Sequence, residues 1–325
     1  MNRLDSEQRA QVLHLLCEGT SVRSTTRLTG VSKTTILKLI ENAGQAAAWY
    51  QDRVFQNLNC KIIEADELWG FCATKEANVT PEKKAKGEGD CWLWMATDPV
   101  TKLVPCWYVG TRSGQAASKF MDDLASRLAG RIQLSTDALF AYSDAVRDAF
   151  EEHIDYGQVV KVFGKVPDSF AGRYSPPQCI GMRKQRMEGN PDYKLVSTSH
   201  AERNNLNVRM HTRRYTRLTN AFSKKIENHK HAMALHFLYY NFVRVHQTLK
   251  VSPAAHATAA DGGRVACAPD RSALRQCGGR VLAVQDGRPP PAISRVKTRD
   301  GGRRCKGISS HYAIFLVDVK YRYMR

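Results

Sequence analysis

The sequence of 325 residues predicts an α/β protein, in which helices flank a mixed β-sheet and a small all-helical domain precedes it. Two observations predict this class. Apolar residues recur at helical spacing over much of the first 59 residues, and from Cys60 short apolar runs typical of strands alternate with helical segments. The length allows one sizeable core with smaller appendages, so one to three domains are expected.

The first segment, residues 5–42, predicts three short helices. Asp5 and Gln8 have the spacing of a capping box at the start of the first helix. The second and third helices are expected to meet at a turn over residues 30–32, which is the form of a helix-turn-helix. A helical hairpin used only for packing is the alternative. In the DNA-binding interpretation, the exposed front of the third helix carries Lys33, Thr34, Thr35 and Lys38.

From residue 60 the predicted order is three strands, helix, strand, helix, strand, helix. The second and third strands are joined by a turn at Asp98 and Pro99. A hairpin-linked trio of strands followed by alternating helices predicts a mixed sheet with helices on its faces. This is also the order of the ribonuclease-H-like fold, in which the first and fourth strands are neighbours.

These patterns predict four parts of the chain. Residues 1–45 form the helix-turn-helix domain and residues 46–59 a helical linker. Residues 60–254 form the ribonuclease-H-like domain, with an irregular insertion at about 165–197. Residues 255–325 are rich in Gly, Pro and Arg and lack periodicity, so they are expected to be a basic, disordered tail.

The net charge of +18 is distributed unevenly. Residues 1–202 hold 25 basic and 25 acidic side chains, residues 203–250 hold 10 and 1, and residues 251–325 hold 14 and 5. The whole excess therefore follows Glu202, which favours a polyanionic partner, most commonly nucleic acid. The polar start and the lack of a long apolar run predict a cytoplasmic, nucleoid-associated protein without a membrane partner. The nine cysteines include no CxxC pair, so reduced thiols and no zinc are expected.

Three acidic residues occupy special places on the predicted skeleton. Asp66 falls at the end of the first strand, Asp137 at the end of the fourth, and Glu202 in the first turns of a later helix. Neighbouring strands would direct both aspartates into one cleft, and the helix would bring Glu202 over it. Such a cluster suits two Mg²⁺ or Mn²⁺ ions about 3.5–4 Å apart, which promote in-line displacement at phosphorus.

The helix that carries Glu202 continues with DNA-binding chemistry. Asn205 and Arg209 follow at spacings of three and seven residues, so all three side chains share one face. An amide and a guanidinium beside a carboxylate suit DNA and phosphate. The positive surface is expected to extend over Arg213, Arg214 and Arg217.

Three motifs, EADELWGF, STDALFAY and SHAERNNLNVRMHTRR, resemble the catalytic motifs of the insertion-sequence-one family of bacterial transposases. The resemblance covers roughly residues 5–254, and YYNFVRVHQTLKVSPA resembles the ending of integrase-type catalytic domains. It implies a DDE recombinase that cleaves at terminal inverted repeats and joins the freed 3′-hydroxyls to target DNA. It also implies a homodimer or larger assembly on DNA. The family's catalytic triad matches Asp66, Asp137 and Glu202, and accompanying motif positions match His200, Asn205 and Arg209.

Two other functions remain open from the sequence. The first is a catalytically inactive DNA-binding regulator of transposition, and the second is a junction-resolving nuclease of the same fold. The chain also departs from the family after HQTLKVSPA, where it becomes rich in Gly and Arg. We hypothesise that a frameshift or readthrough produced the residues from about Ala255 onward. Translation of the coding DNA in the other two frames tests this, because a family-like ending should then appear in one of them.

Overall fold

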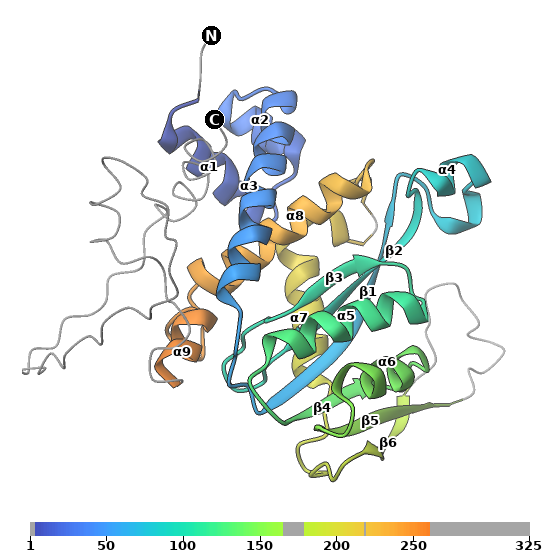
Figure 1. The fold of residues 1–325 in the computed structure, drawn as a ribbon. Helices are drawn as coiled ribbons and strands as arrows, with labels where there is room; N and C mark the ends of the chain where they lie inside the picture. The colour runs from blue at the N-terminus through green and yellow to red at the C-terminus, as the bar shows by residue number, and fades with distance from the viewer. Residues whose placement is uncertain (1–3, 165–178, 218, 261–325) are drawn as a thin grey trace, which may run out of the picture.

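The computed structural model describes residues 4–164, 179–217 and 219–260 (Figure 1). Its centre is a six-stranded sheet with the order β3-β2-β1-β4-β5-β6. The strands are β1 (Ile62–Cys72), β2 (Gly89–Thr97), β3 (Trp107–Gly110), β4 (Ile132–Asp137), β5 (Ile154–Phe163) and β6 (Cys179–Glu188).

The sheet is mixed. β1 pairs antiparallel with β2 and parallel with β4, β4 pairs parallel with β5, and β6 closes the edge antiparallel to β5. The prediction that the first and fourth strands are neighbours is therefore confirmed, and so is the mixed sheet flanked by helices. The order of the first five strands is consistent with the ribonuclease-H-like fold.

Helices cover both faces of this sheet. α5 (Gly114–Arg127) and α6 (Ala141–Phe150) lie on one face, and α7 (Ser199–His211) and α8 (Ile226–Leu238) lie on the other (Figure 1). Side chains alternate along β1, so Ala65 packs in the core under α5 and α6, whereas Leu68 packs in the core under α7 and α8. The same alternation sends the adjacent Asp66 and Glu67 to opposite faces.

The N-terminal helices begin where the sequence predicts. They are α1 (Ser6–Cys17), α2 (Val22–Thr29) and α3 (Lys33–Val54). The Asp5–Gln8 capping box is present, and Gly30 ends α2 in the left-handed conformation at φ 69°. α3 continues to Val54, within the segment predicted as a helical linker. It packs against α8, and Leu235 and Tyr239 belong to the same hydrophobic core as the first three helices.

Shorter elements complete the described part. They are a 3-10 turn at Glu76–Asn78, α4 (Pro81–Ala85), a 3-10 turn at Arg213–Tyr215, a π-helical turn at Tyr239–Val243 and α9 (Pro253–Ala260). Over the residues that can be described, no helix has both the length and the apolar character needed to cross a membrane.

Two predicted irregular segments contain regular structure. Residues 179–188, within the predicted insertion, form β6, whose side chains are largely exposed, so no apolar alternation marks it in the sequence. Residues 255–260, assigned to the tail, belong to α9, and Ala257 is buried in the core. The rest of the predicted disordered tail, from 261 to 325, and insertion residues 165–178 lie outside the described residues.

Gly44 sets the distance between α3 and α8. A Cβ atom at this position would lie 2.5 Å from the backbone oxygen and Cβ of His231. Because that oxygen belongs to the backbone of α8, the two helices would have to separate. We expect Gly44→Ala to lower the free energy of unfolding by about 2 kcal/mol, although alanine has the higher helix propensity. Urea unfolding measures this, and Glu41→Ala on the exposed face of α3 is the control. An equally or more stable Gly44→Ala protein would contradict the close packing.

Candidate active site

The acidic site forms where β1 passes the end of β4. Asp66 faces α7, and its Oδ1 accepts the Glu67 backbone N–H at 2.9 Å. Asp137 is the last residue of β4, and its Oδ1 accepts the Leu139 backbone N–H at 3.0 Å. The parallel pairing of β1 with β4 therefore brings together two carboxylates that lie 71 positions apart in the sequence.

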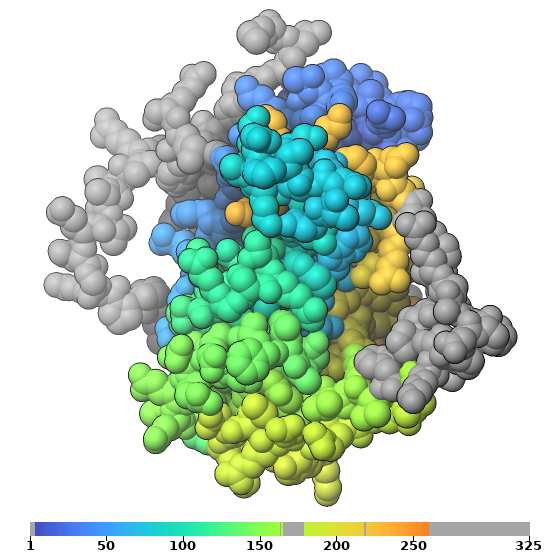
Figure 2. All heavy atoms as spheres, turned by 90° about the vertical axis from the view of Figure 1, so that its right-hand side faces the viewer, coloured from blue at the N-terminus to red at the C-terminus, as the bar shows by residue number. Residues whose placement is uncertain are grey.

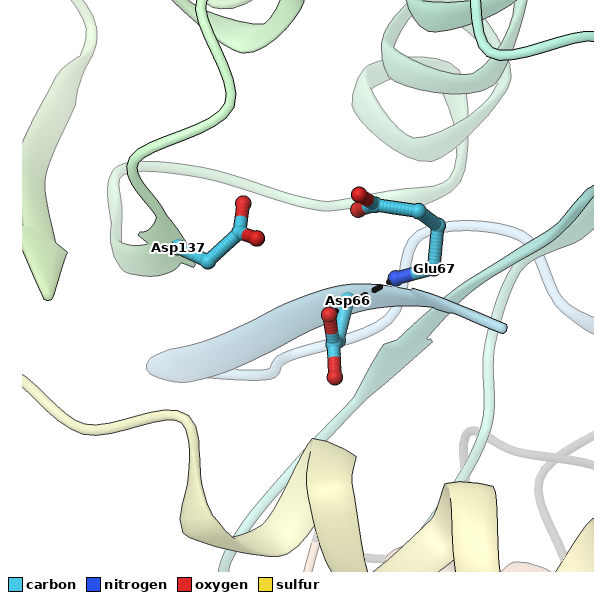
Figure 3. A group of neighbouring side chains, drawn as sticks. All are labelled: Asp66, Glu67 and Asp137. Atoms are coloured by element: carbon cyan, nitrogen blue, oxygen red, sulfur yellow. Dashed lines mark hydrogen bonds between the residues drawn. The ribbon is translucent and has the colours of Figure 1, made fainter. Parts of the chain in front are cut away.

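Glu67 is a third carboxylate beside these two. One oxygen from each of Asp66, Glu67 and Asp137 lies within 4.8 Å of the others, close enough to hold a metal ion. Figure 3 shows Asp66 and Glu67 leaving opposite faces of β1, with the Asp137 carboxylate on the same side of the strand as that of Glu67 in this view. Glu67 is not among the acids predicted from the sequence, although it directly follows Asp66.

The contacts of Glu67 are those of a carboxylate that stabilises the fold. Its side chain is 1% exposed and forms an ion pair with Arg112, whose Nε donates to Oε1 at 2.9 Å. Tyr142 from α6 donates its hydroxyl to the other oxygen at 3.1 Å. Burial and the charge of Asp137 raise the pKa of Glu67, and Arg112 acts against this rise. Glu67 therefore has its charge and hydrogen bonds satisfied by the protein.

Glu202 approaches from α7 and is partly exposed. Its Oε1 is 2.6 Å from the Lys161 ammonium and accepts the Thr198 hydroxyl at 2.8 Å. It is not one of the three residues whose oxygens lie within 4.8 Å of one another. Burial disfavours the charge of Lys161, yet the carboxylates of Glu202, Asp66 and Asp137 raise its pKa overall. Lys161 on β5 therefore contacts Glu202 directly, and the negative charges of Asp66 and Asp137 also favour its protonated form.

Asn205 links α7 directly to Asp66. Its amide nitrogen donates to Asp66 Oδ2 at 2.7 Å, and its amide oxygen is buried without a hydrogen-bond partner. The predicted helical spacing from Glu202 to Asn205 therefore aims both side chains at the same site. A buried acceptor without a donor is costly, and a cation or water at the site would satisfy it.

A further carboxylate, Glu64, fixes the start of α7. Its buried side chain accepts the backbone N–H groups of His200 at 2.7 Å and Ala201 at 3.2 Å. The other oxygen lies 3.0 Å from Nδ1 of His200, a residue to which the family resemblance drew attention. A negative charge at a helix N-terminus is favourable. Glu64 therefore holds α7, and with it Glu202, in register with β1.

Without a bound cation, burial and mutual repulsion disfavour the ionised forms of the carboxylates at this site. The pKa of Asp66 is raised to about 7, first by burial and then by the charges of Glu67 and Asp137. Lys161 lowers it only in part. Such crowding is typical of sites that bind cations, because a bound cation removes both the repulsion and the need for a proton.

The donor set fits Mg²⁺ or Mn²⁺ rather than a thiolate-bound metal. It consists of carboxylate oxygens with an orphaned amide oxygen nearby, and hard divalent cations prefer oxygen ligands. Among the described residues, Asp66, Glu67 and Asp137 have carboxylate oxygens close enough together to hold such an ion, whereas Glu202 is paired with Lys161.

The residues predicted to bind DNA, other than Asn205 at the acidic site, lie in three places. Lys33, Thr34, Thr35 and Lys38 are all exposed at the start of α3, where the Thr35 backbone N–H and hydroxyl also contact the Ser32 cap. Arg209 is partly buried, and burial together with the charge of Arg217 lowers its pKa. Arg213 is exposed beyond the end of α7, and Arg214 is partly buried beside it.

Comparison with known proteins gives limited similarity. No protein-family model matches the chain, and no curated protein matches it in sequence. Among solved structures, it is similar to a piggyBac transposase synaptic complex with hairpin DNA, at 12% identity and a TM-score of 0.39, over 85% of this chain and 70% of that one. It is also similar to a Mos1 transposase paired-end complex with the left transposon end, at 14% identity and a TM-score of 0.20, over 47% and 60%. The resemblance to the insertion-sequence-one family therefore has no support beyond the motifs themselves.

Proposed function

We propose that this chain is a DNA transposase that cuts and joins DNA strands by metal-dependent phosphoryl transfer. The observation that carries the proposal is the closeness of the Asp66 and Asp137 carboxylates, which lie within 4.8 Å of each other, together with the Glu202–Lys161 ion pair. Asp66 faces α7 across from Asn205, and the negative charges of all three acids favour the protonated form of Lys161. Carboxylates held this close without enough positive charge are best explained by divalent cations.

Each residue has a defined part in this chemistry. Asp66, Asp137 and Glu202 would hold two Mg²⁺ or Mn²⁺ ions, which when bound activate the attacking hydroxyl and stabilise the leaving oxygen. Asn205 orients Asp66 through its amide hydrogen bond. The positive charges of Arg209 and Arg217 repel each other, and both residues would bind DNA phosphates on and just after α7.

The finer parts of the proposal rest on the motifs and the surface. The three motifs resemble those of the insertion-sequence-one family, which implies action at terminal inverted repeats and an assembly of two or more copies. Exposed Lys33, Thr34, Thr35 and Lys38 at the start of α3 support DNA binding by residues 1–45. The catalytic unit proposed is residues 60–254, followed in the chain by the basic tail.

A strand cleavage and joining assay tests the proposal. The substrate is a labelled duplex carrying the DNA that flanks this gene, with Mg²⁺ or with EDTA. We expect Mg²⁺-dependent nicking at a defined end and joining of that end to a second duplex. DNA binding without cleavage would instead identify a regulator. Cleavage of branched DNA with no preference for the flanking sequence would identify a junction-resolving nuclease.

Lys161 provides a test of the cation site without DNA. Its ammonium lies where positive charge is needed, so a metal ion must compete with it. We expect Lys161→Gln to strengthen Mn²⁺ binding about tenfold, which corresponds to about 1.4 kcal/mol, as measured by electron paramagnetic resonance of free Mn²⁺. Arg183→Gln on the exposed strand β6 is the control for loss of one positive charge. Weaker or unchanged Mn²⁺ binding by Lys161→Gln would count against the competition.

A further inference from the structure

A basic cavity lies away from the acidic site, where the N-terminal helices face the chain between α7 and α8. Its volume is about 420 Å³. Figure 2 shows the N-terminal helices in blue at the top of the molecule, next to amber residues of the part of the chain that follows α7. No acidic side chain lines it among the described residues, and its five charged lining residues are Arg23, Lys33, Arg213, Arg214 and Lys224.

Arg214 is the residue of this cavity that most strongly indicates an anionic ligand. Burial lowers the pKa of this guanidinium, and its one hydrogen bond within the described chain runs from Nη1 to the Ser223 hydroxyl at 3.0 Å. No carboxylate of the described residues forms an ion pair with it. A desolvated cation without a counterion is costly, and an anion that enters the cavity removes that cost.

The hydrogen-bond network behind Arg214 cannot neutralise it. Ser223 contacts His229 Nδ1 at 2.9 Å, and His229 Nε2 contacts the Tyr215 hydroxyl at 2.9 Å. Burial and the charge of Arg214 lower the pKa of His229 to about 3, so the imidazole is neutral. The network therefore positions the guanidinium and leaves its charge free for a ligand.

Two buried polar atoms in the cavity wall also lack partners. The Thr212 hydroxyl and His236 Nδ1 have no hydrogen bond, and these two residues are 6% and 5% exposed. Glu18, which lies 3.9 Å from His211 in this wall, is itself hydrogen-bonded by the Tyr239 hydroxyl. A ligand with several oxygens would satisfy both Thr212 and Arg214.

We propose that this cavity binds one backbone phosphate of duplex DNA and so ties the N-terminal helices to the catalytic body. Arg214 and Thr212 would contact the phosphate, while Arg23, Lys33, Arg213 and Lys224, all exposed, surround the opening. Exposed cations around a partly buried one fit a polyanion that extends past the cavity, whereas a free phosphate would use only the inner residues. The inference rests on the proposed function for its choice of DNA.

The position also suits a contact distant from the cleavage point. α7 has 13 residues and carries Glu202 near its start, with Arg213 and Arg214 just past its end. At 1.5 Å per residue the helix is about 20 Å long, which corresponds to about six nucleotides of one strand at 3.4 Å each. The phosphate bound here would therefore lie about half a helical turn of DNA from the acidic site.

Equilibrium binding of a labelled duplex in EDTA tests the inference separately from strand cleavage. We expect Arg214→Met to weaken binding about tenfold and to reduce the slope of log affinity against log salt by about 1. Thr212→Val should leave the free protein as stable or more stable, because it removes an unpaired buried hydroxyl, and yet weaken DNA binding several-fold. Lys119→Met, an exposed position on α5 across the sheet, removes one charge as the control and should change neither quantity.

Two results would overturn the proposal. The first is unchanged affinity and salt slope in both Arg214→Met and Thr212→Val while these proteins remain folded. The second is protection by inorganic phosphate: if phosphate alone raises the melting temperature of the wild-type protein but not of Arg214→Met, and duplex DNA does not compete with it, the cavity binds a free anion. Loss of cleavage activity alone would bear on the proposed function and not on this cavity.

Discussion

Glu202→Gln is expected to slow Mg²⁺-dependent strand cleavage about a thousandfold, whereas Glu67→Gln should slow it less than tenfold. The two glutamates are the alternative third carboxylates of the site. Glu202 is partly exposed and paired with the movable ammonium of Lys161, so it can turn to a metal ion. Loss of a metal ligand removes several kcal/mol of transition-state stabilisation, which corresponds to at least three orders of magnitude in rate.

Glu67 should affect stability instead. Its buried carboxylate is already paired with Arg112 and hydrogen-bonded by Tyr142. Because Arg112 is 40% exposed and can turn to solvent, Glu67→Gln is expected to cost about 1–3 kcal/mol of unfolding free energy, less than a fully buried pair would. Single-turnover cleavage and urea unfolding of both variants separate the two roles. The opposite pattern, with cleavage abolished by Glu67→Gln and retained by Glu202→Gln, would make Glu67 the third ligand.

Asp66→Asn is expected to abolish cleavage and at the same time to stabilise the metal-free protein at pH 8. The pKa of Asp66 is about 7 in the folded protein, chiefly because of burial, against an ordinary value of 3.8. The folded state therefore holds this proton more tightly than the unfolded state does. The stability linked to that proton is complete below about pH 4 and is lost as the pH rises to about 7.

The expected gain at pH 8 is on the order of 2–4 kcal/mol, and it should shrink toward zero below pH 4. Urea unfolding in EDTA between pH 4 and pH 8 measures it. Asp144→Asn on α6, whose carboxylate is 67% exposed, is the matched control and should show no such pH dependence. Added Mg²⁺ should stabilise the wild-type protein but not Asp66→Asn. A less stable Asp66→Asn protein at pH 8 would contradict the electrostatic strain at the site.

Much of the skeleton could be predicted because it depends on local periodicity. The end of β4 at Asp137, the adjacency of β1 and β4, and the start of α7 all follow from apolar runs, turns and the order of the elements. The predicted end of the first strand at Asp66 is wrong, because β1 continues to Cys72 by pairing with β2. The face shared by Glu202 and Asn205 follows from helical spacing, and the bond from Asn205 to Asp66 agrees with it.

The residues missed by the sequence analysis are those whose roles depend on contacts distant in sequence. Lys161 lies on β5 and contacts Glu202 on α7, which comes 41 positions later in the sequence. Glu64 acts by capping a helix 136 positions away. β6 escaped detection because its exposed side chains carry no apolar alternation. Only Glu67, which neighbours Asp66, could have been suspected from the sequence alone.

The most direct test of the acidic site compares cleavage with binding in the same variants. Single-turnover cleavage of a labelled duplex with Mg²⁺ is measured for Asp66→Asn, Asp137→Asn and Glu202→Gln, and duplex affinity is measured for each in EDTA. The proposed site predicts that all three variants lose cleavage about a thousandfold or more, with affinities within about threefold of the wild-type protein. Near-normal cleavage by any one of the three would contradict the assignment of Asp66, Asp137 and Glu202 as the metal-binding acids.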